Sequence, residues 1–409
     1  MSRSSDDLSG GTAQSGDEAL TAAEAAERVG VSVSTLRRWA SLGLFTTNDT
    51  SDGWGPSAVA QARALVKLRE RGYSIEQIRE ATDDGRLVGY SDELVGEVVG
   101  ERFTLAEASK KSGLKESEIE ELIAALGLPS AAVNDLGADD VEMFGFFSTA
   151  IESGFPRDAL LQTVRVYGQA VSKIADAEVR LVHLHVHEPL LRDGVPSEKI
   201  EQQMEGITSG LLPLFSPVID HLHRRFLTHF VEQDIVGHME DDGGASEVGQ
   251  VRVAIAFADL AGYTQLTEEV GDEEAAGIVE RFVGNVNQSL PDEARILKTI
   301  GDEVMIVSSD AGSLTDWAVG FQMLSNERPL PRIGIHCGNV VFRDGDYFGR
   351  EVNLAARVAA RAAAGEVLVT WPVVETSGRH LEFELIGEVQ LKGFSQATEL
   401  YLADLAEEK

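Results

Sequence analysis

Two aspartates in the C-terminal part of the chain lie at positions that suit the binding of a phosphate together with a metal ion. Asp259 follows an apolar run that predicts a strand, and Gly262 allows a tight turn before a helix that begins near Thr264. Asp302 follows Gly301 between two other apolar runs, which predicts that it lies at the tip of a hairpin. Two carboxylates plus phosphate oxygens are the usual cradle for a pair of Mg²⁺ ions. Taken singly, each aspartate is better explained as a turn residue or a helix cap.

A second candidate group lies on one predicted helix. Asn353 and Arg357 are four residues apart in a stretch rich in alanine, so they face the same side of that helix. A guanidinium fork there could stabilise charge that builds up on a phosphorus centre, and an asparagine could orient a ribose. An ordinary surface pair on a helix has the same spacing, so the spacing alone leaves both interpretations open.

Lys298 and Asp346 together offer a hydrogen-bond donor and an acceptor. Adenine presents the complementary pattern, with a donor at its exocyclic amine and an acceptor at N1, whereas guanine would require a different arrangement. The periodicity of the sequence does not show whether these two side chains meet.

The region that carries these residues, 250–405, alternates between strand-like and helical patterns. Apolar runs predict strands at 251–257, 294–299, 304–307, 332–336, 367–370 and 398–402. Helical patterns lie between them, at 264–289, 312–325 and 350–363. Strands interleaved with helices over this length predict an α/β or α+β domain, with helices layered over one sheet.

Four segments around these residues, taken together, resemble the catalytic domain of class III nucleotidyl cyclases. Order, spacing and identity agree at six positions: Asp259, Lys298, Asp302, Asp346, Asn353 and Arg357. The step of seven residues from Asp346 to Asn353, and of four more to Arg357, is the one that the family keeps. The resemblance implies a ferredoxin-like α+β fold and an adenylyl cyclase, which converts ATP to cyclic AMP and pyrophosphate.

The same resemblance implies a role for each residue. Asp259 and Asp302 would bind two Mg²⁺ or Mn²⁺ ions per site, and Lys298 with Asp346 would select adenine. The asparagine and the arginine on the helix would act on the transition state. Sites of this family lie between two chains, which implies a homodimer with two equivalent sites.

The sequence departs from the family pattern at two places. Family members often carry a second lysine after Lys-Gly that contacts the triphosphate, and here that position is Phe394. Lys392 could supply the contact instead, although a plain strand lysine fits the sequence as well. The short loop between Val341 and Asp346 resembles the bacterial short-arm branch of the family, which affects the expected dimer contacts and not the chemistry.

The N-terminal half is predicted to be all-helical. Thr21 and Glu24 form a capping box before a helix at 22–29, Gly30 ends this helix, and Ser32 or Ser34 caps the next one. The stretches 21–39 and 65–80 resemble the winged helix-turn-helix of MerR-family regulators, with a domain at 20–92. The wing lacks the arginines usual in DNA binders, so a structural or partner role is favoured over DNA binding, which stays possible.

Residues 103–239 resemble the helical regulatory domain that precedes actinobacterial-type cyclases, on the stretches 103–108, 122–129 and 166–171. Their start repeats the pattern of residue 20 onward, which predicts a weak internal duplication. Seven of the nine histidines lie in the last third of this half: His183, His185, His187, His221, His223, His229 and His238. Imidazole titrates near neutral pH, so a pH switch is one hypothesis and ordinary helix-surface positions are the other.

Bulk properties narrow the class of protein. The net charge of −33 repels nucleic acid and anionic membranes, no apolar run is long enough to span a bilayer, and a single cysteine excludes an intrachain disulfide. We therefore expect a cytoplasmic protein, with a disordered tail at 1–19 and a linker at 240–249.

Two alternatives to an adenylyl cyclase remain at this point. One is a transcription regulator with a non-catalytic cyclase-like domain, and the other is a guanylyl cyclase, against which Lys298 and Asp346 argue.

Overall fold

The computed structural model describes residues 20–45, 53–87, 101–134, 136–240, 250–326 and 328–406. It divides into two compact units, Met1–Phe226 and Leu227–Lys409, and helix α12, Phe215–Glu240, contributes to both. The predicted tail at 1–19 and nearly all of the predicted linker lie outside the described residues. Among the helices that are described, none is long and apolar enough to cross a membrane.

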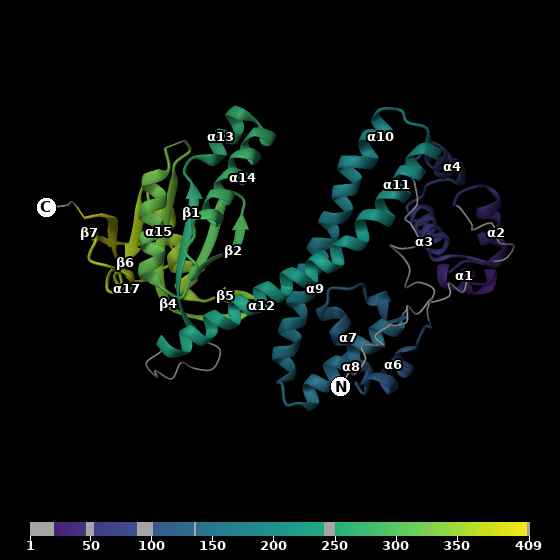
Figure 1. Cartoon of the computed structure of the whole chain (residues 1–409), viewed down its shortest axis with the longest axis horizontal. Helices are drawn as coiled ribbons and strands as arrows, with labels where there is room; N and C mark the ends of the chain where they lie inside the picture. Colours follow the sequence, from purple (N-terminus) through teal and green to yellow (C-terminus); the bar gives the residue numbers. More distant parts are fainter. Residues whose placement is uncertain are drawn as a thin grey trace, which may run out of the picture. The chain divides into compact units, whose positions relative to one another are not determined.

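The C-terminal unit is built on one sheet (Figure 1). Its strands are β1 Gln250–Leu260, β2 Ala294–Ile300, β3 Glu303–Ser308, β4 Pro331–Arg343, β5 Asp346–Phe348, β6 Val367–Thr370, β7 Leu381–Val389 and β8 Thr398–Leu405. The sheet order is β2-β3-β1-β4-β6-β8-β7, and β5 pairs with β4. The first four strands pair antiparallel with helices after β1 and β3, which is the ferredoxin-like β-α-β-β-α-β arrangement. The predicted α+β fold is confirmed.

Helices cover both faces of this sheet. They are α13 Tyr263–Val270, α14 Asp272–Ser289, α15 Ala311–Leu324, α16 Arg350–Arg361 and α17 Trp371–Val374. Ala254 and Ala256 of β1 pack in one core cluster with α14 and α15, whereas Ile255 and Phe257 pack in another with α16. Residues 253–258 of β1 are buried on both faces of the sheet, and they form a continuous apolar run.

Two sequence expectations for this unit need correction. The helix expected over 264–289 is two helices, because Gly271 has a φ of 87°, which no right-handed helix accommodates. The strands β5 and β7 were not expected. Asp344 and Gly345 have φ values of 52° and 75°, as in a two-residue hairpin turn, and this turn returns the chain from β4 to β5.

The N-terminal unit is helical in its described parts, as expected. It begins with α1 Ala22–Val29, α2 Val33–Ser41, α3 Pro56–Glu70 and α4 Ile75–Asp83. The capping box before α1 is present: the Thr21 N–H donates to Glu24 Oε2 at 2.8 Å, and Gly30 ends the helix with a φ of 78°. Ser32, rather than Ser34, caps α2. Residues 46–52, which precede the Gly53-Trp54 pair of the predicted wing, lie outside the described residues.

The second half of this unit repeats that beginning. Its helices are α6 Leu105–Ser112, α7 Glu116–Ala125, α8 Ala138–Glu152, α9 Arg157–Val182, α10 Glu188–Arg192 and α11 Ser197–Leu211. Thr104 and Glu107 form a capping box before α6, which has the same length as α1 and likewise ends at a left-handed glycine. An isolated bridge joins Phe103 to Leu136, as another joins Leu20 to Trp54. The predicted duplication is therefore present in the fold.

Candidate active site

The two predicted metal-binding aspartates lie side by side. Asp259 is near the end of β1, and Asp302 is in the turn between β2 and β3, beside β1 because Ala258 pairs with Val304. Burial, a hydrogen bond with Asp259 and the negative charge of that residue raise the pKa of Asp302 to about 6. The strands thus bring together two carboxylates that lie far apart in the sequence.

Arg332, at the start of β4, was not expected at this site. It is the register partner of Asp259, and its Nε donates to Asp259 Oδ2 at 2.7 Å while its Nη2 donates to the same oxygen. The Asp259 side chain is only 13% exposed, so this pairing offsets much of the cost of burying the carboxylate. The pairing of Arg332 with Asp259 depends on the register of β1 and β4, which the sequence does not reveal.

The carboxylate pair fits a divalent cation. Two neighbouring carboxylates, one with a pKa raised to about 6, repel each other, and a cation between them relieves that repulsion. Within the described part of the chain, no group of three or more His, Cys, Asp and Glu side chains is arranged to hold a metal. The remaining ligands would therefore come from water and from substrate oxygens, which is how Mg²⁺ is usually held.

Lys298 and Asp346 meet in the fold, which the sequence periodicity could not show. The Lys298 Nζ donates to Asp346 Oδ2, and the Tyr347 N–H donates to Asp346 Oδ1 at 2.8 Å. Lys298 lies just after a register shift in the β2–β3 pairing, a bulge of the kind that re-aims side chains. Both side chains keep some exposure, 37% and 27%, so a ligand can reach them.

Asn353 and Arg357 lie on the exposed face of α16, whose opposite face is buried against the sheet. The approach of helix to sheet is close at Gly334 of β4. A Cβ at that position would lie 2.0 Å from the backbone nitrogen of Ala359, which no packing tolerates. Glycine at 334 therefore sets the depth at which α16 rests, and with it the position of both side chains.

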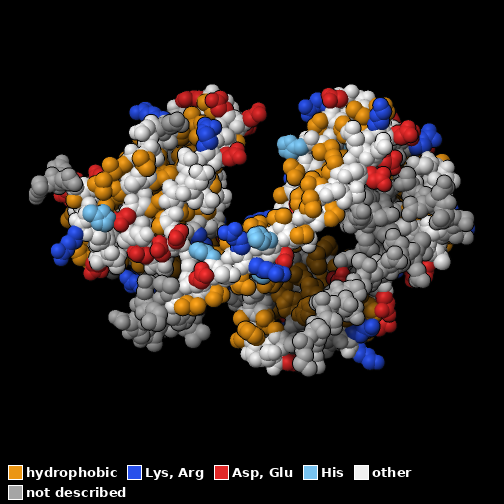
Figure 2. All heavy atoms as spheres, in the orientation of Figure 1, with side chains coloured by type: hydrophobic (Ala, Val, Ile, Leu, Met, Phe, Trp, Pro, Cys, Tyr) orange, Lys and Arg blue, Asp and Glu red, His pale blue; other side chains and the backbone are white. Residues whose placement is uncertain are grey.

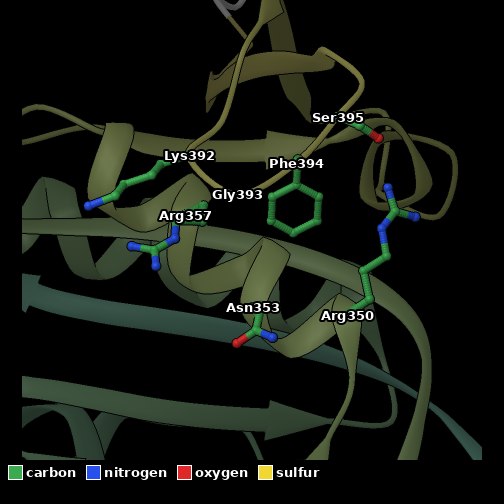
Figure 3. A pocket seen from close by; sticks show the side chains of 7 residues that line it. All are labelled: Arg350, Asn353, Arg357, Lys392, Gly393, Phe394 and Ser395. Atoms are coloured by element: carbon green, nitrogen blue, oxygen red, sulfur yellow. The ribbon is translucent and has the colours of Figure 1, made fainter.

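Asn353 and Arg357 line a pocket of about 590 Å³ (Figure 3). Its lining residues are Arg350, Asn353, Arg357, Lys392, Gly393, Phe394 and Ser395. Lys392 belongs here because Leu391, 4% exposed, packs in a cluster with the buried side of α16. In Figure 3 the side chains of Arg357 and Lys392 extend in the same direction, and Arg350 lies beyond the ring of Phe394. The pocket is thus strongly cationic and suits an anionic ligand.

A buried hydrogen-bonded chain holds the start of α16 to the sheet. His336 of β4 makes one hydrogen bond with Thr370 Oγ1 at 2.7 Å and another with Glu351 Oε2 at 2.6 Å. A carboxylate only accepts, so Nε2 donates to Glu351 and Nδ1 accepts from the Thr370 hydroxyl, which a neutral imidazole can do. Burial lowers the pKa of His336 and keeps the ring neutral. No sequence motif points to these three residues.

One chain therefore presents its predicted site residues in three groups. The carboxylates Asp259 and Asp302 form the first, and Lys298 with Asp346 forms the second. The third is the cationic pocket, whose lining includes none of those four residues.

This fold and these residues define a class of protein. A family model for the adenylate and guanylate cyclase catalytic domain matches residues 247–404, and one for the adenylate cyclase regulatory domain matches residues 45–231. The chain thus combines a nucleotidyl cyclase catalytic domain with a regulatory domain that precedes it.

Relatives define the class more narrowly. The pH-sensitive adenylate cyclase MT1302 of Mycobacterium tuberculosis is 32% identical over 333 residues, which are 79% of this chain and 82% of the relative. An adenylate cyclase of Streptomyces griseus is 25% identical over 83% of each chain. The adenylyl cyclase CyaB from P. aeruginosa, a crystal structure, is similar over 40% of this chain and 98% of that one, with 21% identity and a TM-score of 0.34. The chain belongs to the class III adenylate cyclases.

Proposed function

We propose that this chain converts ATP to 3′,5′-cyclic AMP and pyrophosphate at two sites that are shared between two copies of the chain. The 3′-hydroxyl of ATP attacks the α-phosphorus in line, the new O–P bond forms, and the bond to the β-phosphate oxygen breaks. The hydroxyl proton leaves to solvent, and pyrophosphate departs. Asn353 orients the ribose, and Arg357 stabilises the charge that develops on the α-phosphate oxygens.

Lys298 and Asp346 select the base. Lys298 donates a hydrogen bond to adenine N1, and Asp346 accepts one from the exocyclic amine. The ion pair that they form without a ligand supports this assignment, because it holds the donor and the acceptor side by side. Guanine would bring a donor against Lys298 and leave the carboxylate without its partner, which costs binding.

Asp259 and Asp302 would hold Mg²⁺ or Mn²⁺, with two ions per site. When bound, these ions supply positive charge to the attacking and leaving oxygens. Asp259 stays oriented by Arg332, whose side chain donates twice to the same oxygen. Lys392 adds a positive charge to the end of the pocket towards which Arg357 also extends.

The observation that supports a shared site is the set of residues that line the cationic pocket. The carboxylate pair does not line the cationic pocket, so a second copy that faces the first would complete each site. Exposed apolar side chains on α12 support a homodimer: Val218, Leu222, Val231 and Ile235 are 52%, 46%, 49% and 60% exposed. Figure 2 shows further apolar side chains at the surface of the helical part of the chain.

The helical half, as a regulatory domain at 103–239, would set the activity of the catalytic domain at 250–405 in response to pH. His183, His185 and His187 form a π-helical turn between α9 and α10, a local irregularity that is frequent at functional sites. The Nδ1 atoms of His183 and His187 lie 3.5 Å apart, and the buried His187 also donates from Nε2 to the Gly85 carbonyl at 2.9 Å. Protonation of both rings would place two positive charges in contact and disfavour this arrangement.

A pH profile tests this regulation. We expect the activity of the full chain to change between about pH 5.5 and 8, and the change to shrink in His187→Gln, because glutamine keeps a donor without titrating. His229→Gln, an exposed helix residue, is the matched control. A flat profile for the unaltered chain would end the hypothesis.

The first part of the chain, 20–92, would serve as a MerR-like helix-turn-helix with a structural or partner role. Arg37 and Arg38 are exposed on α2, but a chain with a net charge of −33 opposes DNA phosphates unless a larger basic patch is present. A gel shift on random genomic fragments distinguishes a structural or partner role from DNA binding. Retarded DNA at moderate salt would show that the chain binds DNA and would contradict the proposed role.

Product identification tests the proposed activity directly. The purified full chain, given ATP or GTP with Mg²⁺ or Mn²⁺, should form cyclic AMP and little or no cyclic GMP. Asp302→Ala should be the blank. The activity of a chain that starts at Gly249, compared with that of the full chain, shows whether the helical half activates or inhibits the catalytic domain. Cyclic GMP as the main product, or no cyclic product with either ion, would refute the proposal.

A further inference from the structure

Arg350 is a residue of the cationic pocket to which the proposed chemistry gives no role. It is the first residue of α16, and it precedes Asn353 by three positions and Arg357 by seven. Residues with this spacing lie on one helical face, so all three project to the side on which the pocket opens. The pocket therefore holds a third cation besides Arg357 and Lys392.

The side chain of Arg350 rests on an aromatic ring. Its Cζ atom lies 5.3 Å from the centroid of Phe394, close enough for a cation–π contact. A guanidinium stacked in this way keeps the N–H groups at its edge available for an oxyanion. The stacking also restrains a long side chain before any ligand binds, which lowers the entropic cost of binding.

The neighbouring carboxylate, Glu351, forms an ion pair with Arg350 but accepts no hydrogen bond from it. Glu351 Oε1 is 3.9 Å from Arg350 Nη1, which is beyond hydrogen-bond distance. The other oxygen of Glu351 is held by a hydrogen bond from His336, which ties the carboxylate to the sheet. The side chain of Arg350 is thus held in place by Phe394, and its N–H groups donate no hydrogen bond to Glu351.

We propose that Arg350, stacked on Phe394, binds the polyphosphate end of the nucleotide together with Arg357 and Lys392. Three positive charges that line one pocket repel each other, and a polyphosphate with several negative charges relieves that repulsion more fully than a single phosphate. Phe394 is then a positioning residue that acts through Arg350. The inference rests on the proposed function, because it assumes that the nucleotide of the cyclase reaction occupies this pocket.

The test measures two quantities on the full chain, the KM for ATP and the Kd for inorganic tripolyphosphate by calorimetry in the presence of Mg²⁺. We expect Arg350→Ala to raise both by about tenfold, the loss usual for a charge-assisted hydrogen bond, with a smaller change in kcat. Phe394→Leu should raise both by a smaller factor, because the cation remains without its aromatic support. Arg361→Ala is the matched control, since Arg361 is an exposed arginine at the other end of the same helix, outside the pocket lining.

The outcomes separate the inference from the function on which it rests. If the unaltered chain forms cyclic AMP while Arg350→Ala keeps its KM and its Kd for tripolyphosphate, the inference is wrong and the function stands. An equal loss in Arg361→Ala would also overturn it, because the effect would then be one of general charge. If the unaltered chain binds tripolyphosphate and loses that binding in Arg350→Ala but forms no cyclic AMP, the cationic site stands and the proposed function fails.

Discussion

The acidic and the basic parts of the candidate site are built in different ways. Asp259 and Asp302 sit at the end of a central strand and in the adjoining hairpin turn, so the register of the sheet fixes their separation. The basic side chains project from the exposed face of α16 and from the loop that follows Leu391. The first group depends on hydrogen bonds between strands, and the second depends on how one helix docks. A change in helix docking should therefore disturb only the basic part.

The largest expected effect comes from the acidic part. Asp302→Asn keeps the shape of the side chain and removes its charge, so we expect kcat to fall by about a thousandfold or more as metal binding is lost. The fold should survive, because burial and the charge of Asp259 already oppose ionisation of this carboxyl. Steady-state kinetics and thermal unfolding of the same preparation check both statements. Retained activity at saturating Mn²⁺ would show that Asp302 is not needed to hold the metal.

Gly334→Ala should disturb the basic part through the docking of α16. The added Cβ would lie 2.0 Å from the Ala359 nitrogen, so the helix must shift, at a cost of about 1–3 kcal/mol in the free energy of unfolding. We expect the KM for ATP to rise and kcat to fall, while Mn²⁺ binding at the carboxylates changes little.

Gly320→Ala is the matched control for this substitution. Gly320 lies in α15, and a Cβ there would meet nothing within 4 Å, so alanine should be neutral or slightly stabilising. Urea unfolding and calorimetric Mn²⁺ titration measure the two quantities. Loss of Mn²⁺ binding in Gly334→Ala would contradict the separate construction of the two parts.

The smallest expected effect is a pH dependence of stability at His336. Its pKa in the folded chain is lowered from 6.5, mainly by burial, and the positive charges of Arg252 in β1 and Arg350 in α16 add to the shift while Glu351 opposes it. Below about pH 6.5 the unfolded chain binds a proton that folded His336 resists, so the free energy of unfolding falls as the pH falls.

His336→Gln removes that contribution. The difference in unfolding free energy between the unaltered chain and the variant should therefore shrink between about pH 8 and 5.5. Urea titrations at several pH values measure it. A difference that stays constant or grows as the pH falls would mean that the ring is charged in the folded chain.

The sequence predicts best those features that depend on near neighbours. The capping boxes before α1 and α6, the hairpin that exposes Asp302 and the shared face of Asn353 and Arg357 all follow from spacings of two to four residues. The turn at Asp344 and Gly345 carried a comparable signal for β5, since this dipeptide favours a two-residue hairpin. The same holds for β7, where Leu381, Phe383 and Leu385 alternate with polar residues.

Other features depend on contacts between distant segments, and no local pattern reveals them. Arg332 meets Asp259 only through the register of β1 and β4, 73 positions apart in the sequence. Lys298 and Asp346 meet because a bulge in β2 and a tight turn before β5 bring them together. Arg350 reaches Phe394 only because the loop after Leu391 packs on α16. Candidate site residues could be named from the sequence, whereas their grouping in the fold could not.

The most direct test of the shared site is the activity of a defined heterodimer. Asp302→Ala and Arg357→Ala, each almost inactive alone, are co-expressed with different tags and purified by both tags in succession. If each site takes its carboxylates from one chain and its basic residues from the other, one of the two sites is intact, and the heterodimer should show about half the activity of the unaltered dimer. A heterodimer as inactive as either parent, beside an active unaltered dimer carrying the same tags, would contradict a site shared between chains.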